Sequence, residues 1–528
     1  MKRRDFIKTA APIGLTPFFV NGMSFKALAS SPLLSLLAQQ SLNNGRVLVL
    51  IQLNGGNDGL NTVIPLDQYS NLSAARSNVI IDENKVLKLN GTLNTGLHPA
   101  MAGIRNMYND GLVSIVQDVG YPNPNFSHFR ATDIWLTGSD SNQFLDSGWL
   151  GRFLDGQFPG YPTNYPNVDM PDPLALQIGS VISPALQGAQ VNAGMAISNP
   201  DSFYQLLTGT TDPAPNTPAG HELTYIRLVA QQTDKYSSAI KDAAGKAANK
   251  STLYPASGNS LADQLKIVAR LVAGGLKTPI YMVNIGGFDT HAAQVNATGG
   301  TETGAHATLL QRVSEAVYAF QDDLKLLGVD DKVAGMTFSE FGRRIKSNAG
   351  LGTDHGAAAP LIVFGKGVNP GIVGNSPTIP ANVSVNDNVP MQNDFRSVYT
   401  SVLADWFEIS PSEINSVMLN NYAVLPIFRK SANSVSETEA LTGGLKLMQN
   451  YPNPAATATQ IEFFTEGGYT LLKLYDNVGR EVATITEGTM GYGKQSIELN
   501  VADLPAGNYY YQIRNGSQQQ TRNLVVYR

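Results

Sequence analysis

Over the first 425 residues, short apolar runs alternate with amphipathic stretches. Residues 46–53, 112–119, 280–285, 332–338 and 357–364 are apolar runs that predict buried strands. Residues 128–136, 303–327 and 394–406 have the apolar spacing of helices. Because strands alternate with helices, we predict an α/β fold, a doubly wound and mostly parallel sheet with helices on both faces.

The pattern changes after a polar segment rich in Ser, Thr, Glu and Gly at residues 430–445. Short alternating strands separated by turn residues follow at residues 460–464, 470–476, 481–485, 494–499, 508–514 and 521–527. Such a series predicts a small all-β, immunoglobulin-like sandwich. We therefore expect an α/β domain at residues 30–429, a linker at 430–445 and the sandwich at 446–528.

The first 29 residues predict an export signal. Residues 2–8 are basic and contain Arg3-Arg4, residues 10–20 are weakly apolar, and Ala27-Leu28-Ala29 fits a cleavage site. The segment resembles a twin-arginine signal, with Ile7 where the consensus has Leu. An ordinary secretory signal is the alternative, and it leads to the same export. We expect the mature chain to begin near Ser30.

Composition excludes several classes of function. The chain has 528 residues, enough for two or three domains, and a net charge of −5, which offers no basic surface for nucleic acid. It has no cysteine, which excludes disulfides, thiolate metal sites and a cysteine nucleophile. Beyond the signal, no apolar run reaches the roughly 18 residues that a spanning helix needs, so we expect no transmembrane segment.

Ionisable residues follow the predicted strands at the point where each one ends. Asp289 and His291 come directly after Gly286-Gly287, Glu340 follows the strand at 332–338, and His355 precedes the strand at 357–364. Residues two apart in extended backbone share a face, about 6.6 Å apart. The carboxyl edge of an open α/β sheet is where ligands bind. We interpret these side chains as candidate metal ligands; an exposed polar loop is the alternative for Asp289 and His291.

Ser127 follows a proline-rich loop and stands at the start of the predicted helix at 128–136. A hydroxyl group at a helix N-terminus lies beside free N–H groups, a suitable place for a nucleophile that attacks an anionic ester. Serine is also a common N-cap, so a purely structural role is the alternative. His306, near the start of another predicted helix, is expected at the surface.

Two families share motifs with nearly the whole chain. In the first part of the chain the motifs are Asn54–Asn61, Phe126–Phe129, Gly287–His291, Ser339–Arg343, Thr353–Gly356 and Asp394–Arg396. In the last part they are Gln449–Pro454, Leu474–Arg480 and Leu504–Tyr509. With these motifs, residues 46–425 resemble the DUF1501 family of the alkaline-phosphatase/sulfatase-like superfamily, and residues 446–528 resemble the type A C-terminal sorting domain of the type IX secretion system. The second resemblance implies passage across the outer membrane of a Bacteroidetes-like source, with the secretion machinery as a partner.

The superfamily resemblance implies one or two divalent cations above the strand ends. Asp58 resembles the acidic ligand after the first strand, Asp289 and His291 the Asp/His pair of one metal, and His355 the last histidine ligand. Glu340 stands where the superfamily has Asp followed by His. Zinc, calcium, magnesium and manganese are the candidate ions. Because Glu340-Phe341 lacks that histidine, we expect an oxygen-rich, histidine-poor site that favours calcium, magnesium or manganese at one position.

The leading hypothesis is a secreted metal-dependent hydrolase of phosphate or sulfate esters, small-molecule or glycan. Ser127 would be the nucleophile, His128 a candidate base, and Arg343 or Arg396 a bidentate clamp for the ester oxygens. Without cysteine, a cysteine-type sulfatase is excluded. The alternative is a non-catalytic secreted or surface protein that uses the same fold to bind glycan or metal.

We predict that a chain ending at Ser431 folds by itself, because the composition breaks at the linker and the strand pattern after it is independent. Removal of residues 446–528 is expected to leave the protein in the periplasm. Cell fractionation of the full-length and truncated proteins measures this. Efficient release of the truncated protein into the medium would rule out the sorting role.

Overall fold

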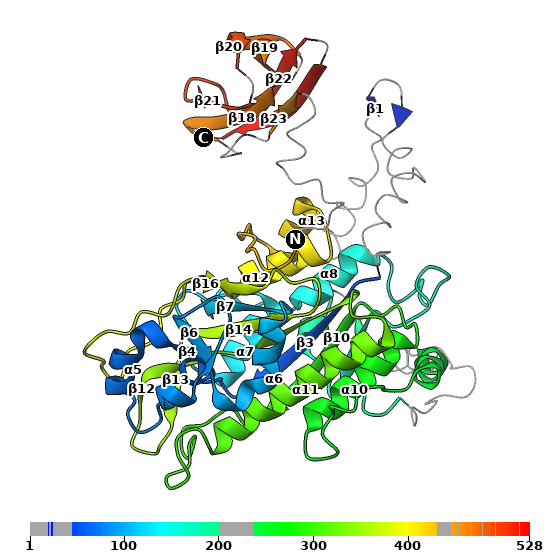
Figure 1. Cartoon of the computed structure of the whole chain (residues 1–528). Coiled ribbons are helices and arrows are strands. Elements are labelled where there is room, and N and C mark those ends of the chain that lie inside the picture. Colours follow the sequence, from blue (N-terminus) through cyan, green and yellow to red (C-terminus); the bar gives the residue numbers. More distant parts are fainter. Residues whose placement is uncertain are drawn as a thin grey trace, which may run out of the picture. The chain divides into compact units, whose positions relative to one another are not determined.

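The computed structural model describes residues 19–20, 23–24, 45–189, 191–200, 236–429 and 445–527, the last range without 449, 451, 452, 454, 466, 478, 492 and 517. It divides into two compact units, Met1–Arg429 and Lys430–Arg528 (Figure 1). The predicted signal lies outside the described residues except for a ribbon of β1 (Phe19–Val20) and β2 (Met23–Ser24). The predicted linker lies outside them except for Leu445.

The first unit is built on a nine-stranded sheet in the order β15-β7-β14-β11-β3-β10-β8-β9, with β16 also beside β7. The strands are β3 (Val47–Asn54), β7 (Val113–Gly120), β8 (Ala175–Ile178), β9 (Gly194–Ile197), β10 (Ile280–Gly286), β11 (Val333–Phe338), β14 (Ala359–Phe364), β15 (Gly371–Val373) and β16 (Asn393–Asp394). Only β14 runs against its neighbours in this sheet. The prediction of a mostly parallel sheet is confirmed.

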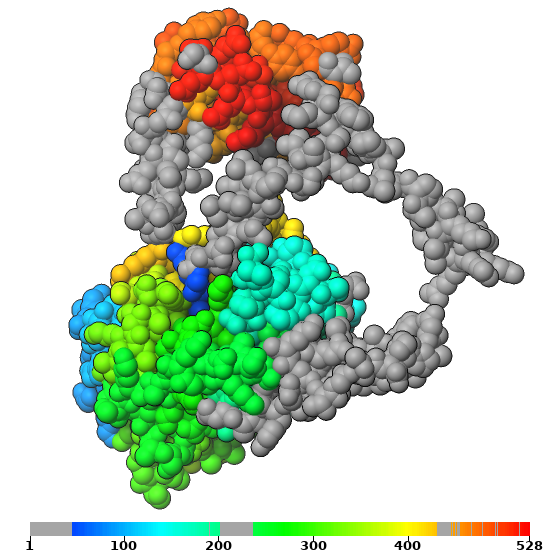
Figure 2. All heavy atoms as spheres, turned by 90° about the vertical axis from the view of Figure 1, so that its right-hand side faces the viewer, coloured from blue at the N-terminus to red at the C-terminus, as the bar shows by residue number. Residues whose placement is uncertain are grey.

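Helices cover both faces of this sheet. The central strand β3 explains why, since Val49 and Ile51 pack into one apolar core and Leu48 and Leu50 into another. The first core includes α6 (Ala102–Asn109), α10 (Ser260–Ala273) and α11 (Ala305–Leu327); the second includes α7 (His128–Thr137), α8 (Trp149–Gln157), α12 (Phe395–Ser401), a π-helical turn (Val402–Trp406) and α13 (Pro411–Met418). Figure 2 shows the green residues of the α10–α11 region at the surface of the first unit. The doubly wound arrangement is therefore confirmed.

Smaller elements lie near the carboxyl edge of the sheet. They are the hairpin of β12 (Gly342–Ser347) and β13 (Thr353–Gly356), the small sheet of β4 (Val63–Pro65), β6 (Thr95–Leu97) and β5 (Leu87–Lys88), and the helices α4 (Gly59–Thr62) and α5 (Tyr69–Ala75). Short 3₁₀ turns span Leu66–Gln68, Glu83–Lys85, Pro99–Met101 and Pro184–Leu186. A separate apolar cluster, which includes Leu60, Leu72 and Ile345, joins α4 and α5 to β12.

The second unit is all β. One antiparallel sheet has the order β17-β18-β21 and the other β20-β19-β22-β23. Their bounds are β17 (Lys446–Leu447), β18 (Ala458–Thr465), β19 (Gly468–Tyr475), β20 (Glu481–Met490), β21 (Gly493–Asn500), β22 (Gly507–Asn515) and β23 (Gln518–Val526). Side chains of both sheets, such as Phe463 and Tyr511, share one core, as the sandwich prediction requires. In neither described unit does a helix have the length and apolar character needed to cross a membrane.

Asp118 is the place where β7 departs from regular strand geometry. Its φ of 48° lies in the left-handed region, and the pairing of β7 with β14 shifts register beside it. Its carboxyl group is buried and accepts a hydrogen bond from Gln392 Nε2. Burial raises the pKa of Asp118 to about 7, although the bond from Gln392 opposes the rise.

We predict that this carboxyl group makes stability depend on pH. The folded chain keeps the proton where the unfolded chain has lost it, so the unfolding free energy should fall as pH rises from about 4 to about 7. Asp118→Asn keeps an acceptor for Gln392 and tolerates the left-handed backbone. It should remove this dependence and be more stable at pH 8 by roughly 2–4 kcal/mol.

Urea unfolding followed by tryptophan fluorescence measures the effect, because all 3 tryptophans lie in the first unit. Asp110→Asn, at an exposed aspartate, is the control. An Asp118→Asn protein with the same pH profile as the unmodified chain would contradict this account.

Candidate functional site

The carboxyl ends of β3, β7, β10 and β11 meet at one edge of the sheet, where the reversed β14 begins. The loops after these strands and the hairpin before β14 therefore come together. They place five predicted site residues in one cluster: His128, Asp289, His291, Glu340 and His355. The structure does not bring Asp58 or Arg396 into this cluster.

Asp289 lies between three imidazole rings. Its Oδ1 is 3.2 Å from Nε2 of His291 and 3.3 Å from Nε2 of His355, and its Oδ2 is 3.5 Å from Nε2 of His128. The two Nε2 atoms of His291 and His355 are 2.8 Å apart. Candidate ligand atoms of His128, Asp289 and His355 lie within 4.8 Å of one another, which is a spacing that one cation can bridge.

The other nitrogen of each ring has a partner of its own. Nδ1 of His128 is 2.9 Å from Glu340 Oε1, Nδ1 of His291 is 3.0 Å from Asp354 Oδ1, and Nδ1 of His355 is 2.7 Å from the Phe126 carbonyl oxygen. A carbonyl or an ionised carboxylate only accepts hydrogen bonds, so each Nδ1 carries a proton, and a ring in its neutral form has its lone pair on Nε2.

The protonation of the cluster agrees with this assignment. Burial lowers the pKa of His355, which favours the neutral ring. Burial alone would raise the pKa of Asp289, but the hydrogen bond and the positive charge of Arg343 lower it. Lone pairs and a carboxylate thus face one another, an arrangement that repels itself unless a cation lies between them. The donor set fits a divalent metal.

Glu340 orients a histidine of the cluster instead of facing the open side. Its side chain is 3% exposed. Oε1 accepts a hydrogen bond of 2.8 Å from the Gly55 N–H and faces His128, while Oε2 accepts one of 3.2 Å from Ser339 Oγ. The cluster is therefore richer in histidine than the sequence suggested, because His128 joins His291 and His355. Such nitrogen-rich sites suit zinc, which imidazole binds well.

Arg343 is completely buried and connects the loops of the site. Its Nε donates to the Gly56 carbonyl oxygen and its Nη1 to that of Thr353. Its Nη2 donates to the carbonyl oxygens of Gly55 and Phe288 and, at 2.8 Å, to Asp289 Oδ1. The sequence predicts a substrate clamp at Arg343; in the structure these contacts use its guanidinium group, and the side chain is 0% exposed.

The loop after β3 can pass this close to β10 only because it has glycines. Gly55 has a φ of 122°, and a Cβ there would lie 2.3 Å from the Asp289 backbone nitrogen. Gly56 has a φ of 80°, and a Cβ there would lie 2.3 Å from the ring of Phe341. Any larger residue would push the Asp289 loop away from Arg343.

Asp58 is buried in an ion pair with Arg76. Both carboxylate oxygens lie 2.9 Å from Arg76 Nη1, and Gln294 Nε2 donates to Oδ2 at 2.6 Å. Burial would raise the pKa of Asp58, but the charge of Arg76 and the hydrogen bonds lower it. The partner of the Asp58 carboxylate is therefore Arg76 and not the histidine cluster. Gln294 connects it to the hairpin, because its Oε1 accepts from Thr353 Oγ1 at 2.8 Å.

Arg396 also has a structural role. Its guanidinium group pairs with Asp394, the N-cap residue of α12, and with Asp140. The Arg396 side chain is 3% exposed. The two arginines that the sequence suggested as clamps therefore both hold the fold together.

Ser127 is exposed at the N-cap position of α7, between Phe126 and His128. Its side chain makes no capping hydrogen bond, while its backbone N–H donates to Asn125 Oδ1 at 2.9 Å. Both of its neighbours in the chain contact the cluster. The carbonyl oxygen of Phe126 faces Nδ1 of His355, and the ring of His128 faces Asp289. The alternative role for Ser127, a purely structural N-cap, requires a side-chain hydrogen bond to the helix, and Ser127 does not make one.

Three residues of the site region were missed or misplaced by the sequence reasoning. Asp354 orients His291, and Asn348 Nδ2 donates to both Asp354 Oδ1 and the His291 carbonyl oxygen. The sequence did offer one signal for Asp354, because this residue directly precedes the candidate ligand His355. His306 is buried and not at the surface, with Nε2 2.9 Å from Asn57 Oδ1. Burial lowers the pKa of His306 to about 4.

Sheet, reversed strand and histidine cluster define an α/β protein with a candidate metal centre at the carboxyl edge. The profile of a family described as "Protein of unknown function (DUF1501)" matches residues 115–418. Because this is more than half of the chain, the protein belongs to the DUF1501 family. A secretion system C-terminal sorting domain matches residues 449–527, which implies secretion or attachment to the cell surface.

Solved structures similar to this chain include a sulfatase from Pseudoalteromonas sp., with 11% identity over 89% of this chain and 88% of that one and a TM-score of 0.31. A protein of the alkaline phosphatase superfamily from Vibrio parahaemolyticus is similar over 87% of this chain and 88% of that one, with 10% identity and a TM-score of 0.33. A phosphonate monoester hydrolase from Silicibacter pomeroyi is similar over 91% of this chain and 89% of that one, with 9% identity and a TM-score of 0.30. None of the curated proteins compared with this chain matches it.

We predict that the purified protein binds a divalent metal through this cluster. His291→Ala should abolish binding, and Asp354→Asn, which weakens the contact that orients His291, should weaken it about 10–100-fold. Elemental analysis and titration of the metal-free protein with zinc or manganese measure both effects. Asp263→Asn, at an exposed carboxylate on α10, is the matched control. Unchanged metal content in His291→Ala would argue against the centre.

Proposed function

We propose that the protein is a secreted, metal-dependent hydrolase of phosphate or sulfate esters. The observation that carries the proposal is the convergence of three imidazole Nε2 atoms on the Asp289 carboxylate, each with its Nδ1 occupied by an acceptor. His128, His291, His355 and Asp289 would hold the metal. When bound, a divalent cation supplies a positive charge that stabilises ester oxygens and makes a nearby hydroxyl group more acidic.

Ser127 is the proposed nucleophile. A serine hydroxyl is a weak nucleophile at neutral pH and needs an adjacent cation or base. Ser127 directly precedes His128, which supports a position beside the metal centre. With the His128 ring turned toward Asp289, we assign it to the ligands and not to the role of a separate base.

The N-terminus of α7 would bind the oxygens of the ester. Because Ser127 makes no capping bond, the first N–H groups of this ten-residue helix remain free for another acceptor. Unpaired N–H groups and the helix dipole favour an anion there. Arg343 would act indirectly: it keeps the Asp289 carboxylate in place and charged.

For its route, we propose export through the periplasm after recognition of the N-terminal signal, followed by transfer through the type IX machinery. The sorting domain at residues 449–527 supports the second step. The paired arginines at Arg3-Arg4 support the first.

We predict that Ser127→Ala keeps the fold and the metal but loses on the order of 10³-fold or more in turnover, as covalent nucleophiles do. Turnover of 4-nitrophenyl phosphate and 4-nitrophenyl sulfate, together with urea unfolding, measures this. Ser70→Ala, at an exposed serine of α5, is the control.

A Ser127→Ala enzyme with the turnover of the wild type would exclude Ser127 as the nucleophile. A metal-loaded wild-type protein that turns over neither ester would exclude the proposed hydrolase and favour a non-catalytic binding protein.

A further inference from the structure

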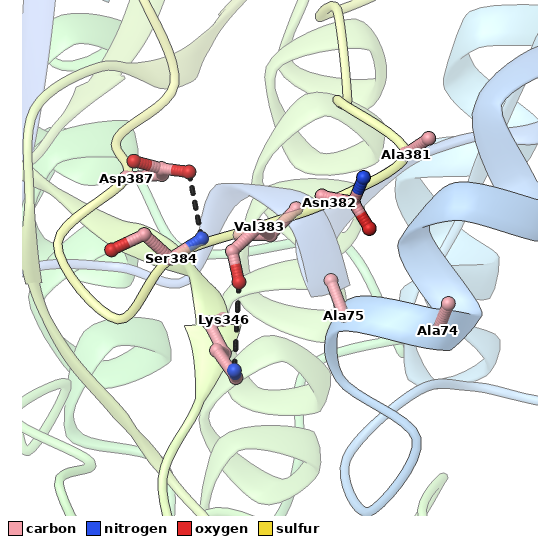
Figure 3. Close-up of a pocket in the computed structure, with 8 residues that line it drawn as sticks. All are labelled: Ala74, Ala75, Lys346, Ala381, Asn382, Val383, Ser384 and Asp387. Atoms are coloured by element: carbon pink, nitrogen blue, oxygen red, sulfur yellow. Dashed lines mark hydrogen bonds between the residues drawn. The ribbon is translucent and has the colours of Figure 1, made fainter.

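A second candidate binding site lies between α5 and the segment that follows β15. Figure 3 shows a pocket with Ala74 and Ala75 on one side and Lys346 with residues 381–384 on the other. Its volume is about 450 Å³, within the roughly 300–1,000 Å³ usual for small-molecule sites. None of its lining residues belongs to the proposed metal centre.

The lining offers polar groups of several kinds around a small apolar surface. The methyl groups of Ala74 and Ala75 are apolar, Asn382 contributes an amide, Ser384 a hydroxyl group and Asp387 a carboxylate. Polar groups of several kinds beside the methyl groups of Ala74 and Ala75 suit a ring that carries several hydroxyl groups. The Asn382 amide makes no hydrogen bond with any described residue, so it is free to bind one.

Lys346 adds a positive charge to this lining. The one hydrogen bond described for its ammonium group is a long one, 3.5 Å to the Val383 carbonyl oxygen. Two further N–H donors remain for a ligand. Asp387 is already partly used, since its Oδ2 accepts from the Ser384 N–H at 2.8 Å. An anionic group therefore fits at the lysine, and uncharged hydroxyl groups fit near Asp387.

Arg344 connects the pocket to the metal centre. It lies two residues before Lys346 on β12, and both side chains donate to the segment after β15, Arg344 to the Val385 carbonyl oxygen and Lys346 to that of Val383. Its Nε donates to the His355 carbonyl oxygen at 3.2 Å, and its Nη1 donates to that of Val385 at 2.6 Å. Its Nη2 has no acceptor among the described residues. Two cations thus follow one another along β12 in a chain whose net charge is −5.

We propose that this pocket binds a sugar unit that carries an anionic group, a carboxylate or a sulfate. Lys346 holds the anionic group, Asn382, Ser384 and Asp387 hold hydroxyl groups, and the two alanines contact the ring. The site does not depend on ester hydrolysis. Because Arg344 joins it to His355, it suits one unit of an acidic glycan that extends along β12.

Calorimetric titration of the full-length protein tests the proposal, in the presence of a chelator so that the metal centre contributes nothing. The probes are a disaccharide with one uronic acid, a sulfated disaccharide and a neutral disaccharide. We expect at least one acidic probe to bind more tightly than the neutral one. Lys346→Met should weaken that binding about tenfold, the loss expected for one charge-assisted hydrogen bond. Ala74→Leu, which fills the pocket, should weaken it at least as much.

Lys88→Met, at an exposed lysine of β5, is the matched control and should bind as the wild type does. Comparison of the affinities for the uronic acid disaccharide and the sulfated disaccharide shows which anionic group the pocket prefers. Equal affinity for the neutral and acidic probes, or unchanged affinity in both Lys346→Met and Ala74→Leu, would overturn the proposal. Turnover of the 4-nitrophenyl esters by metal-loaded Lys346→Met should equal that of the wild type, so a failure here is distinct from a failure of the hydrolase proposal.

Discussion

The geometry of the site depends on one buried cation, the guanidinium group of Arg343. A charge removed from water requires acceptors on every side. The acceptors here are carbonyl groups from the loops after β3 and β10 and from β13, together with the Asp289 carboxylate. The same group therefore fixes three segments and holds the central carboxylate in its ionised form. Gly55 and Gly56 permit this because they let the backbones approach closely.

The carboxylates of the site divide into two kinds. Asp289 alone lies between the rings, whereas Glu340 and Asp354 each face the Nδ1 of one histidine. Carboxylates in this orienting position fix the tautomer and raise the basicity of the ring. Glu340, after β11, and Asp354, in β13, would therefore act on a bound metal only through histidines, and the candidate ligand set is richer in nitrogen than the order of residues indicated.

The fold was predictable from the sequence because apolar runs and helical spacing are local signals. The convergence of Asp289, His291, Glu340 and His355 followed from their places at strand ends. The partners of Asp58 and Arg343 were not predictable, since each pairing depends on where distant loops pass; Arg343 reaches Gly56 over 287 positions. The reversal of β14 had a weak signal, because no helix separates it from β11 and parallel neighbours need such a crossover.

The spacing of the cluster along the chain has a kinetic consequence. His128 and Glu340 are separated by 212 positions, and His291 and His355 by 64. A nascent chain therefore cannot assemble the complete ligand set until residue 355 has left the ribosome. Contacts of such long range form slowly, because the loop-closure entropy is lost before they stabilise the fold. A metal ion held by all of these residues would therefore bind only after the last of them, His355, has been made.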